Sequence, residues 1–180
     1  MTGAFFGGVF DRTPEILVDS DSVIVFTNKR PDSGDKDVLL CVPAAYSTDD
    51  GEIIGRYSFG KKRRGTSERR FATVYLDKGT YFQQHPLLRN GRGRRFTDPK
   101  RRYRRALCRS GKRYRIVHSS RPVTLTAFAA SLTEYDEAWN LDMGTYSYGW
   151  YRDDWGLHHL GLSTVWNRGK QTNWIVVRRK

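Results

Sequence analysis

The segment that decides the fold runs from residue 123 to residue 141 and reads VTLTAFAASLTEYDEAWNL. Its apolar residues first recur at positions i, i+3, i+4 and i+7, which are Leu125, Phe128, Ala129 and Leu132. This spacing is typical of an amphipathic helix. Thr124 is a favourable N-cap, so the pattern predicts a helix that starts there and ends near Glu134. The period then changes, and the apolar run at residues 138–141 predicts a short strand.

Short apolar runs separated by turn residues fill most of the remaining chain. They predict strands at residues 16–18, 23–27, 38–42, 53–59, 71–76, 80–83, 105–109, 113–118 and 174–177. Asp50-Gly51 and Asp77-Lys78-Gly79 are the clearest turn signals between them. The sequence therefore predicts an α+β fold, in which a mainly antiparallel sheet packs against one helix. Its length of 180 residues fits a single domain, residues 1–180.

Positive charge is concentrated in the middle of the chain. The formal net charge is +13, and 22 of the 32 Lys and Arg residues lie between Arg56 and Arg121, opposed there only by Glu68, Asp77 and Asp98. Such a distribution indicates an anionic partner, namely nucleic acid, an anionic glycan, a phosphorylated substrate or a membrane surface. A solvated basic face without any partner is the alternative interpretation.

Several classes of protein are not indicated by the sequence. No run approaches the roughly 18 apolar residues of a membrane-spanning helix, and no secretion signal is visible at the N-terminus, which leaves the compartment open. Cys41 and Cys108 set no disulfide framework, and whether they pair stays undetermined. The spacing of Cys and His fits no metal site, so we expect neither a metal nor another cofactor.

The segment at residues 123–132, followed by EAWNLDMGTYS at residues 137–147, resembles the phosphodiester glycosidase family. That family has a helix with the pattern T-L-x-x-F-A, then a strand ending in N-L-D-G-G, then a small-residue loop containing Ser. Weaker similarities precede the helix, at residues 105–107, 116–119 and 39–55. The resemblance spans roughly residues 38–150.

The resemblance implies a hydrolase, of a family found mainly outside the cytoplasm, that cleaves the glycosidic bond of a sugar-1-phosphodiester. This reaction needs a carboxylate to stabilise an oxocarbenium-like sugar and a cation to bind the phosphate. Matching the family pattern, Asp142 is the expected carboxylate and Arg105 the expected phosphate ligand, since a guanidinium binds phosphate through two parallel hydrogen bonds. The neighbouring Arg101, Arg102 and Arg104 are alternatives to Arg105, and strand alternation directs Arg104 and Arg105 to opposite faces. Asn140 shares a strand face with Asp142 and is expected to bind a sugar hydroxyl or orient the carboxylate.

Further substrate contacts are expected around the strand end. Thr145 and Ser147 offer hydroxyl groups and the Gly144 region offers backbone N–H groups, while Tyr46 and Tyr146 are candidates for a surface on which the sugar stacks. Each has a structural alternative: Asp142 as a loop residue that caps its own turn, Asn140 as a buried amide, and the tyrosines as core residues.

Two departures from the family pattern keep a non-catalytic alternative open. Pro43 stands where the family usually has Asn, and Met143 stands where it often has Gly. A domain that binds a glycan or an anionic polysaccharide without cleaving it would tolerate both. Binding of nucleic acid is a further alternative, because residues 61–121 mix Arg with Tyr and Phe, although no known nucleic-acid-binding motif is present.

Overall fold

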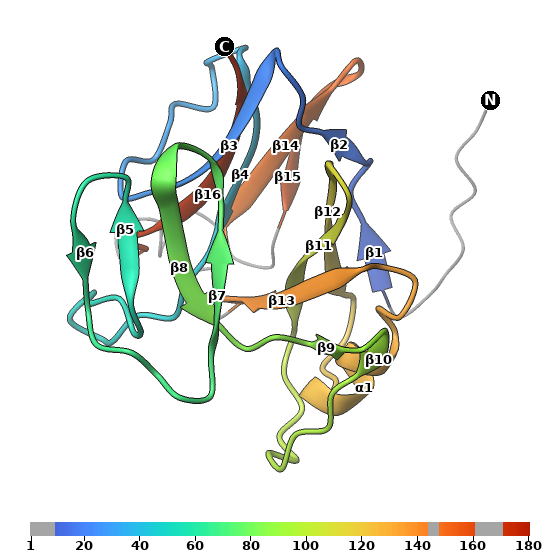
Figure 1. Ribbon diagram of the computed structural model, residues 1–180. Helices are drawn as coiled ribbons and strands as arrows, with labels where there is room; N and C mark the ends of the chain where they lie inside the picture. Colours follow the sequence, from blue (N-terminus) through green and yellow to red (C-terminus); the bar gives the residue numbers. More distant parts are fainter. Residues whose placement is uncertain (1–9, 144–147, 161–170) are drawn as a thin grey trace.

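The computed structural model describes residues 10–143, 148–160 and 171–180 and consists largely of antiparallel β-sheet (Figure 1). Three sheets surround a common core, and a small two-stranded ribbon and one helix lie below the first of them.

The first sheet contains β13, the strand of the segment that resembles the family pattern. Its strand order is β1-β12-β11-β13, and β2 also pairs with β12. The strands are β1 (Phe10–Arg12), β2 (Ile16–Leu17), β11 (Arg105–Ser110), β12 (Arg113–Ser119) and β13 (Glu137–Leu141). In the register of β11 and β13, Arg105 lies opposite Leu141 and Ala106 lies opposite Asn140.

The second sheet pairs the C-terminal strand of the chain with two strands from its first quarter. Its order is β15-β14-β4-β16-β3. The strands are β3 (Ser22–Thr27), β4 (Val38–Pro43), β14 (Gly149–Asp153), β15 (Gly156–Leu160) and β16 (Trp174–Arg179). Gly149 permits the close approach of β14 to β4, since a Cβ there would lie 2.8 Å from the carbonyl oxygen of Cys41.

The third sheet has the order β6-β5-β8-β7, and a separate ribbon pairs β9 with β10. The elements are β5 (Tyr57–Phe59), β6 (Arg63–Arg64), β7 (Ala72–Tyr75), the 3-10 turn η1 (Asp77–Gly79), β8 (Thr80–Gln84), β9 (Leu88–Arg89) and β10 (Arg92–Gly93). The predicted turn at residues 77–79 is therefore the connection of the β7–β8 hairpin.

The predicted helix forms but is shorter than expected. Helix α1 (Leu125–Ala130) is capped by Thr124, whose hydroxyl accepts a hydrogen bond from the Ala127 N–H at 3.1 Å. It buries Phe128 and neighbouring apolar residues against the first sheet, as the spacing predicted. The segment after Ala130 forms turns, and the Ser131 hydroxyl donates back to the Phe128 carbonyl at 2.6 Å, so the helix ends one turn early.

The expectation of an α+β fold is wrong, because the protein is essentially all-β. β-Structure accounts for 47% of the described residues and helical structure for 6%, with α1 the one α-helix among them. Helical periodicity was confined to one segment, and a helix of six residues covers part of one sheet without forming a layer. The sequence interpretation also missed the β14–β15 hairpin, because it treated residues 142–149 as a loop and assigned no strands to the aromatic-rich segment that follows.

The main core lies where the three sheets face one another. It includes Phe26 and Val42 from the second sheet, Phe82 from the third, and Leu107 and Leu141 from the first. Two further apolar clusters cover the outer faces, one between α1 and the first sheet and one around Trp150 on the second sheet.

Both cysteines are buried and unpaired. Cys41 lies in the cluster on the second sheet and Cys108 in the cluster under α1, and burial raises the pKa of both thiols, that of Cys41 to about 12. No helix among the described residues is long and apolar enough to cross a membrane.

Candidate active site

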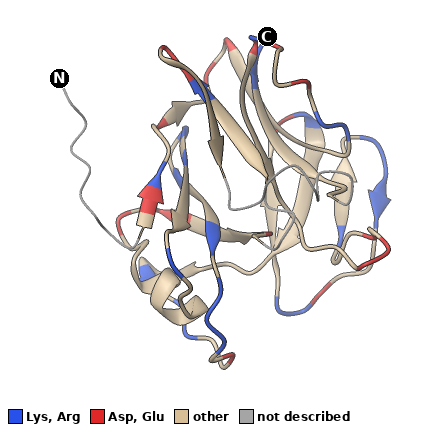
Figure 2. Ribbon diagram, turned by 180° about the vertical axis from the view of Figure 1, so that it is seen from behind, with Lys and Arg blue, Asp and Glu red and all other residues tan. Residues whose placement is uncertain are grey.

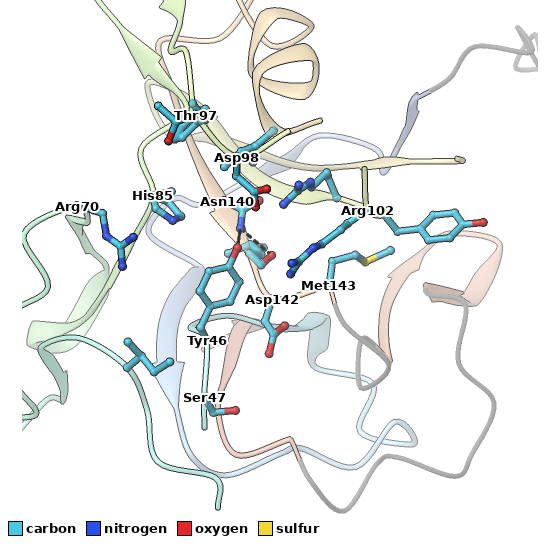
Figure 3. Close-up of a pocket in the computed structure, with 16 residues that line it drawn as sticks. Tyr46, Ser47, Arg70, His85, Thr97, Asp98, Arg102, Asn140, Asp142 and Met143 are labelled. Atoms are coloured by element: carbon cyan, nitrogen blue, oxygen red, sulfur yellow. Dashed lines mark hydrogen bonds between the residues drawn. The ribbon is translucent and has the colours of Figure 1, made fainter. Parts of the chain in front are cut away.

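A cavity of about 480 Å³ lies where strands from all three sheets end (Figure 3). Its walls come from the residues that follow β4, from the segment after β8, from the end of β13, and from the strap at residues 96–104 that precedes β11. The lining residues are Tyr46, Ser47, Ile54, Arg70, His85, Phe96, Thr97, Asp98, Arg102, Tyr103, Arg104, Leu125, Asn140, Leu141, Asp142 and Met143.

Main-chain hydrogen bonds fix the end of β13 between two neighbouring segments. The Asn140 N–H donates to the His85 carbonyl at 2.9 Å, and the Asp142 N–H donates to the Ala44 carbonyl at 2.9 Å. The next residue, Ala45, is held in turn by the buried Asn173 side chain, which accepts from the Ala45 N–H at 2.7 Å and donates to its carbonyl at 3.2 Å. The candidate carboxylate therefore projects from a well-anchored backbone.

The Asn140 amide and the Tyr46 hydroxyl form the floor of the cavity. Asn140 is 1% exposed, and its Nδ2 donates to the Tyr46 hydroxyl oxygen at 2.5 Å and to the Leu141 carbonyl at 3.3 Å. Its Oδ1 is buried and has no hydrogen-bond partner among the described residues. A buried acceptor without a partner is costly, so a hydroxyl group or a water in the cavity is the expected donor.

Tyr46 is held as a neutral hydrogen-bond donor. Burial is the largest cause that raises its pKa, and the Asp142 charge acts in the same direction, while Arg104 opposes it. Because the Tyr46 oxygen already accepts from Asn140, its own proton is available to a ligand.

Three arginines give the cavity an excess of positive charge. Arg70, Arg102 and Arg104 line it against the carboxylates of Asp98 and Asp142. In Figure 3, Arg70 lies on one side of the Asn140–Tyr46 pair and Arg102 on the other. The strap that carries Arg102 is fixed to the start of the α1 segment, because Arg102 and Val123 exchange two main-chain hydrogen bonds of 3.0 and 2.9 Å.

Arg104 is the most rigidly held of the three. It is 6% exposed, and its guanidinium donates to the Val123 carbonyl at 3.3 Å and to the Lys100 carbonyl at 3.0 Å. Burial lowers its pKa, and the neighbouring Arg102 charge adds to that effect. An anion in the cavity would oppose this lowering, because a nearby negative charge stabilises the charged guanidinium.

His85 adds a titratable group to the same wall. Its ring makes edge-on contacts with the rings of Phe71, Phe96 and Tyr46, at centroid separations of 4.7, 5.6 and 6.2 Å. Burial, followed by the charges of Arg70 and Arg94, lowers the pKa of His85. The imidazole is therefore neutral at neutral pH.

Arg105 is fully buried and does not line the cavity. It lies opposite Leu141 on the core face of the first sheet. Burial lowers its pKa to about 10, and the Asp142 charge opposes that effect. Arg105 thus interacts electrostatically with the candidate carboxylate from behind the cavity wall.

The structure brings three of the expected residues, Tyr46, Asn140 and Asp142, to one cavity. Gly144, Thr145, Tyr146 and Ser147 lie outside the described residues, so their expected contacts stay predictions. Met143 lines the cavity, whereas Pro43 ends β4 opposite Trp174 in β16.

Sequence analysis did not identify His85, Arg70 or Asp98 as site residues. His85 directly follows an alternating strand, which was the only available signal. Arg70 and Asp98 lie in basic segments whose path around the cavity depends on long-range pairing. Among the described residues, no group of three or more His, Cys, Asp and Glu side chains is arranged to hold a metal ion.

Comparison of this structure with solved structures shows a similarity of fold. The chain matches the catalytic domain of zebrafish N-acetylglucosamine-1-phosphodiester alpha-N-acetylglucosaminidase, determined in a form auto-inhibited by its pro-peptide, with a TM-score of 0.60. The match covers 96% of this chain and 84% of the zebrafish chain, at 12% sequence identity. No protein-family profile and no curated protein matches the sequence. The protein therefore has the fold of a phosphodiester glycosidase catalytic domain.

Proposed function

We propose that this protein hydrolyses the glycosidic bond of a sugar-1-phosphodiester in the cavity at the end of β13. The observation that carries the proposal is the composition of that cavity: a carboxylate, an unsatisfied buried amide oxygen, a tyrosine hydroxyl and three arginines meet in about 480 Å³. Each group matches one requirement of the reaction. The fold is similar to that of the catalytic domain of N-acetylglucosamine-1-phosphodiester alpha-N-acetylglucosaminidase, whose name describes the cleavage of such a bond.

The charge balance of the cavity suits a phosphodiester. Arg70, Arg102 and Arg104 contribute three positive charges, and Asp98 and Asp142 contribute two negative charges, while His85 is neutral. The lining thus has a formal charge of +1, which complements the single negative charge of a phosphodiester. We assign the phosphate to the side of Arg102 and Arg104, because the Arg104 guanidinium and the Arg102 main chain are held in place by hydrogen bonds before substrate arrives.

The sugar is assigned to the floor formed by Asn140 and Tyr46. A sugar hydroxyl donates to Asn140 Oδ1, which otherwise has no partner, and the Tyr46 hydroxyl donates to a second sugar oxygen. We assign the anomeric carbon to the side of Asp142, which lines the same cavity. A site that hydrogen-bonds a hydroxyl through buried groups discriminates strongly against a sugar that lacks it.

In the reaction, the bond between C1 of the sugar and the phosphate oxygen breaks, and that oxygen retains the electron pair. Asp142 stabilises the positive charge that develops at C1, as nucleophile or as base for the attacking water. The attacking water provides the hydroxyl group at C1 of the free sugar. Its remaining proton is taken up by the released phosphomonoester. We assign Arg105 a supporting role through its electrostatic interaction with Asp142, and direct contact of Arg105 with phosphate stays a prediction.

The test is hydrolysis of a panel of sugar-1-phosphodiesters, including N-acetylglucosamine-1-phospho-methylmannoside, by the wild type and by Asp142→Asn. The expected result is release of free sugar and phosphomonoester by the wild type, with the variant folded and at least about a hundredfold slower. Equal turnover by a folded Asp142→Asn protein would refute the assigned role. Binding of a phosphodiester without release of sugar by the wild type would favour the non-catalytic alternative, to which the departures at Pro43 and Met143 lend support.

A further inference from the structure

A second surface with the character of a ligand-binding site lies on the third sheet, at the end of β8 remote from the cavity. Its aromatic part is Tyr75 in β7 and Tyr81 in β8, which lie opposite each other in the register of the hairpin. Their ring centroids are 5.7 Å apart with an interplanar angle of 55°. Tyr75 is 71% exposed, so this pair presents an aromatic face to solvent on the edge strand of the sheet.

A cluster of cations adjoins the tyrosine pair through the strand register. Tyr81 pairs with Ser58 in β5, and Ser58 pairs with Arg63 in β6. Residues paired across neighbouring strands point to the same face, so Arg63 lies on the tyrosine side, two strand spacings or about 10 Å from Tyr81. Ser58 between them is small and 5% exposed.

The turn before β6 adds further positive charge. Lys61, Lys62, Arg63 and Arg64 are all exposed, and none of them forms an ion pair within the described part of the chain. Figure 2 shows β6 and the turn before it as a continuous basic segment. Gly60 holds this turn against the β7–β8 turn: its φ is 96°, and a Cβ there would lie 2.8 Å from the Lys78 carbonyl oxygen.

We propose that Tyr75, Tyr81 and this basic turn bind a phosphate-bearing glycan chain, with a sugar ring on the tyrosines and its phosphate groups on the cations. Tyrosine offers an apolar face together with a polar hydroxyl, which suits a sugar ring, and the cluster of unpaired cations is complementary to phosphate. The inference rests on the proposed function, because it takes the polymeric form of the same substrate class as the ligand.

The geometry of β8 connects this surface to the cavity. Tyr81 and His85 are four residues apart on one extended segment and share a face, so they are separated by about 13 Å, the length of a few sugar residues. The segment at residues 65–70 lies beside β8, because the Glu68 N–H donates to Gln83 Oε1 at 3.1 Å. The Arg56 N–H donates to the same oxygen at 2.8 Å. Arg69 in this segment is exposed and adds a further cation near β8.

A glycan fits this surface better than a single-stranded nucleic acid. Proteins that bind single strands present successive aromatic platforms along a basic groove. Here one pair of tyrosines occurs, and its rings are tilted against each other. The surface therefore supports one bound sugar with flanking phosphates rather than a track of stacked bases.

The experiment measures binding of a fluorescently labelled phosphorylated dextran oligosaccharide by anisotropy, at two or more salt concentrations. Unmodified dextran of the same length and a single-stranded dT oligonucleotide of matched charge serve as comparison probes. The variants are Tyr75→Ala and the double variant Lys62→Gln/Arg63→Gln. Their controls are Trp155→Ala, since Trp155 is 91% exposed on the β14–β15 turn, and Arg89→Gln/Arg92→Gln on the β9–β10 ribbon.

We expect Tyr75→Ala to weaken binding at least about threefold, as for loss of one aromatic contact. The double variant should reduce the slope of log affinity against log salt by about 1 to 2, the value for two lost phosphate contacts, while both controls bind as the wild type does. Wild-type affinity in both site variants, or tighter binding of the oligonucleotide than of the phosphorylated dextran, overturns the proposal. Hydrolysis of a small sugar-1-phosphodiester is measured in parallel and should be unchanged in these variants, so a failure of the proposed catalytic function is seen separately.

Discussion

The interaction between Arg105 and Asp142 leads to a quantitative prediction. Arg105 is fully buried, and burial lowers its pKa to about 10 although Asp142 opposes the shift. Because one pKa unit corresponds to about 1.4 kcal/mol, keeping this guanidinium charged in the core costs about 3 kcal/mol even beside Asp142. Removing the Asp142 charge should therefore increase the cost.

We expect Asp142→Asn to lower the free energy of unfolding by about 1–3 kcal/mol, the range measured for coupled neighbouring groups. In Arg105→Met the buried charge is absent, so the same Asp142→Asn change should then cost much less. The four proteins of this double-mutant cycle are compared by urea unfolding at neutral pH, with the m-value checked for constancy. Additivity of the two single changes within about 0.5 kcal/mol would refute the electrostatic coupling.

The remaining predictions concern the core, the cavity floor and the pH dependence. Phe128→Ala should lower the free energy of unfolding by about 3–5 kcal/mol, because the ring is fully buried between α1 and the first sheet. Urea unfolding measures this change, and Ala127→Ser on the exposed side of α1 is the control. Tyr46→Phe should keep the fold but reduce kcat/KM by about tenfold or more, through loss of one hydrogen bond to the sugar; unchanged kcat/KM would exclude Tyr46 from substrate binding. Burial and the nearby arginines lower the pKa of His85 in the folded protein, so the unfolded chain takes up a proton first as pH falls. The free energy of unfolding should therefore decrease as pH falls from the pKa of His85 in the unfolded chain to its lower pKa in the folded protein. Urea unfolding from pH 7.5 to 5 should show a weaker loss in His85→Gln, and an identical loss in both proteins would contradict this account.

The local signals in the sequence were sufficient for many of the elements. Alternation and turn residues located β3, β4, β8 and β16 to within a residue or two, and the N-cap and apolar spacing located the start of α1. These features depend only on residues that are close together in the sequence. The apolar spacing predicted that Phe128 lies on the buried side of the helix, and its burial in the cluster between α1 and the first sheet confirms this.

The fold class was less predictable because it depends on pairing between distant segments. The β14–β15 hairpin has aromatic and charged residues on both faces, so periodicity did not distinguish it from a loop, and the weight given to one helix led to the wrong class. The same limitation applies to the site. Asn140 and Asp142 followed from one short motif, whereas Arg70 and His85 reach the cavity only because β7, β8 and β13 come together.

The position of bond cleavage tests the central claim most directly. Hydrolysis of a sugar-1-phosphodiester is carried out in ¹⁸O-labelled water, and the products are analysed by mass spectrometry. Cleavage between C1 and oxygen, as we predict for a site in which Asp142 stabilises the sugar cation, places the label in the free sugar and none in the phosphomonoester. Label in the phosphomonoester would show attack at phosphorus and would contradict the assignment of this protein as a glycosidase.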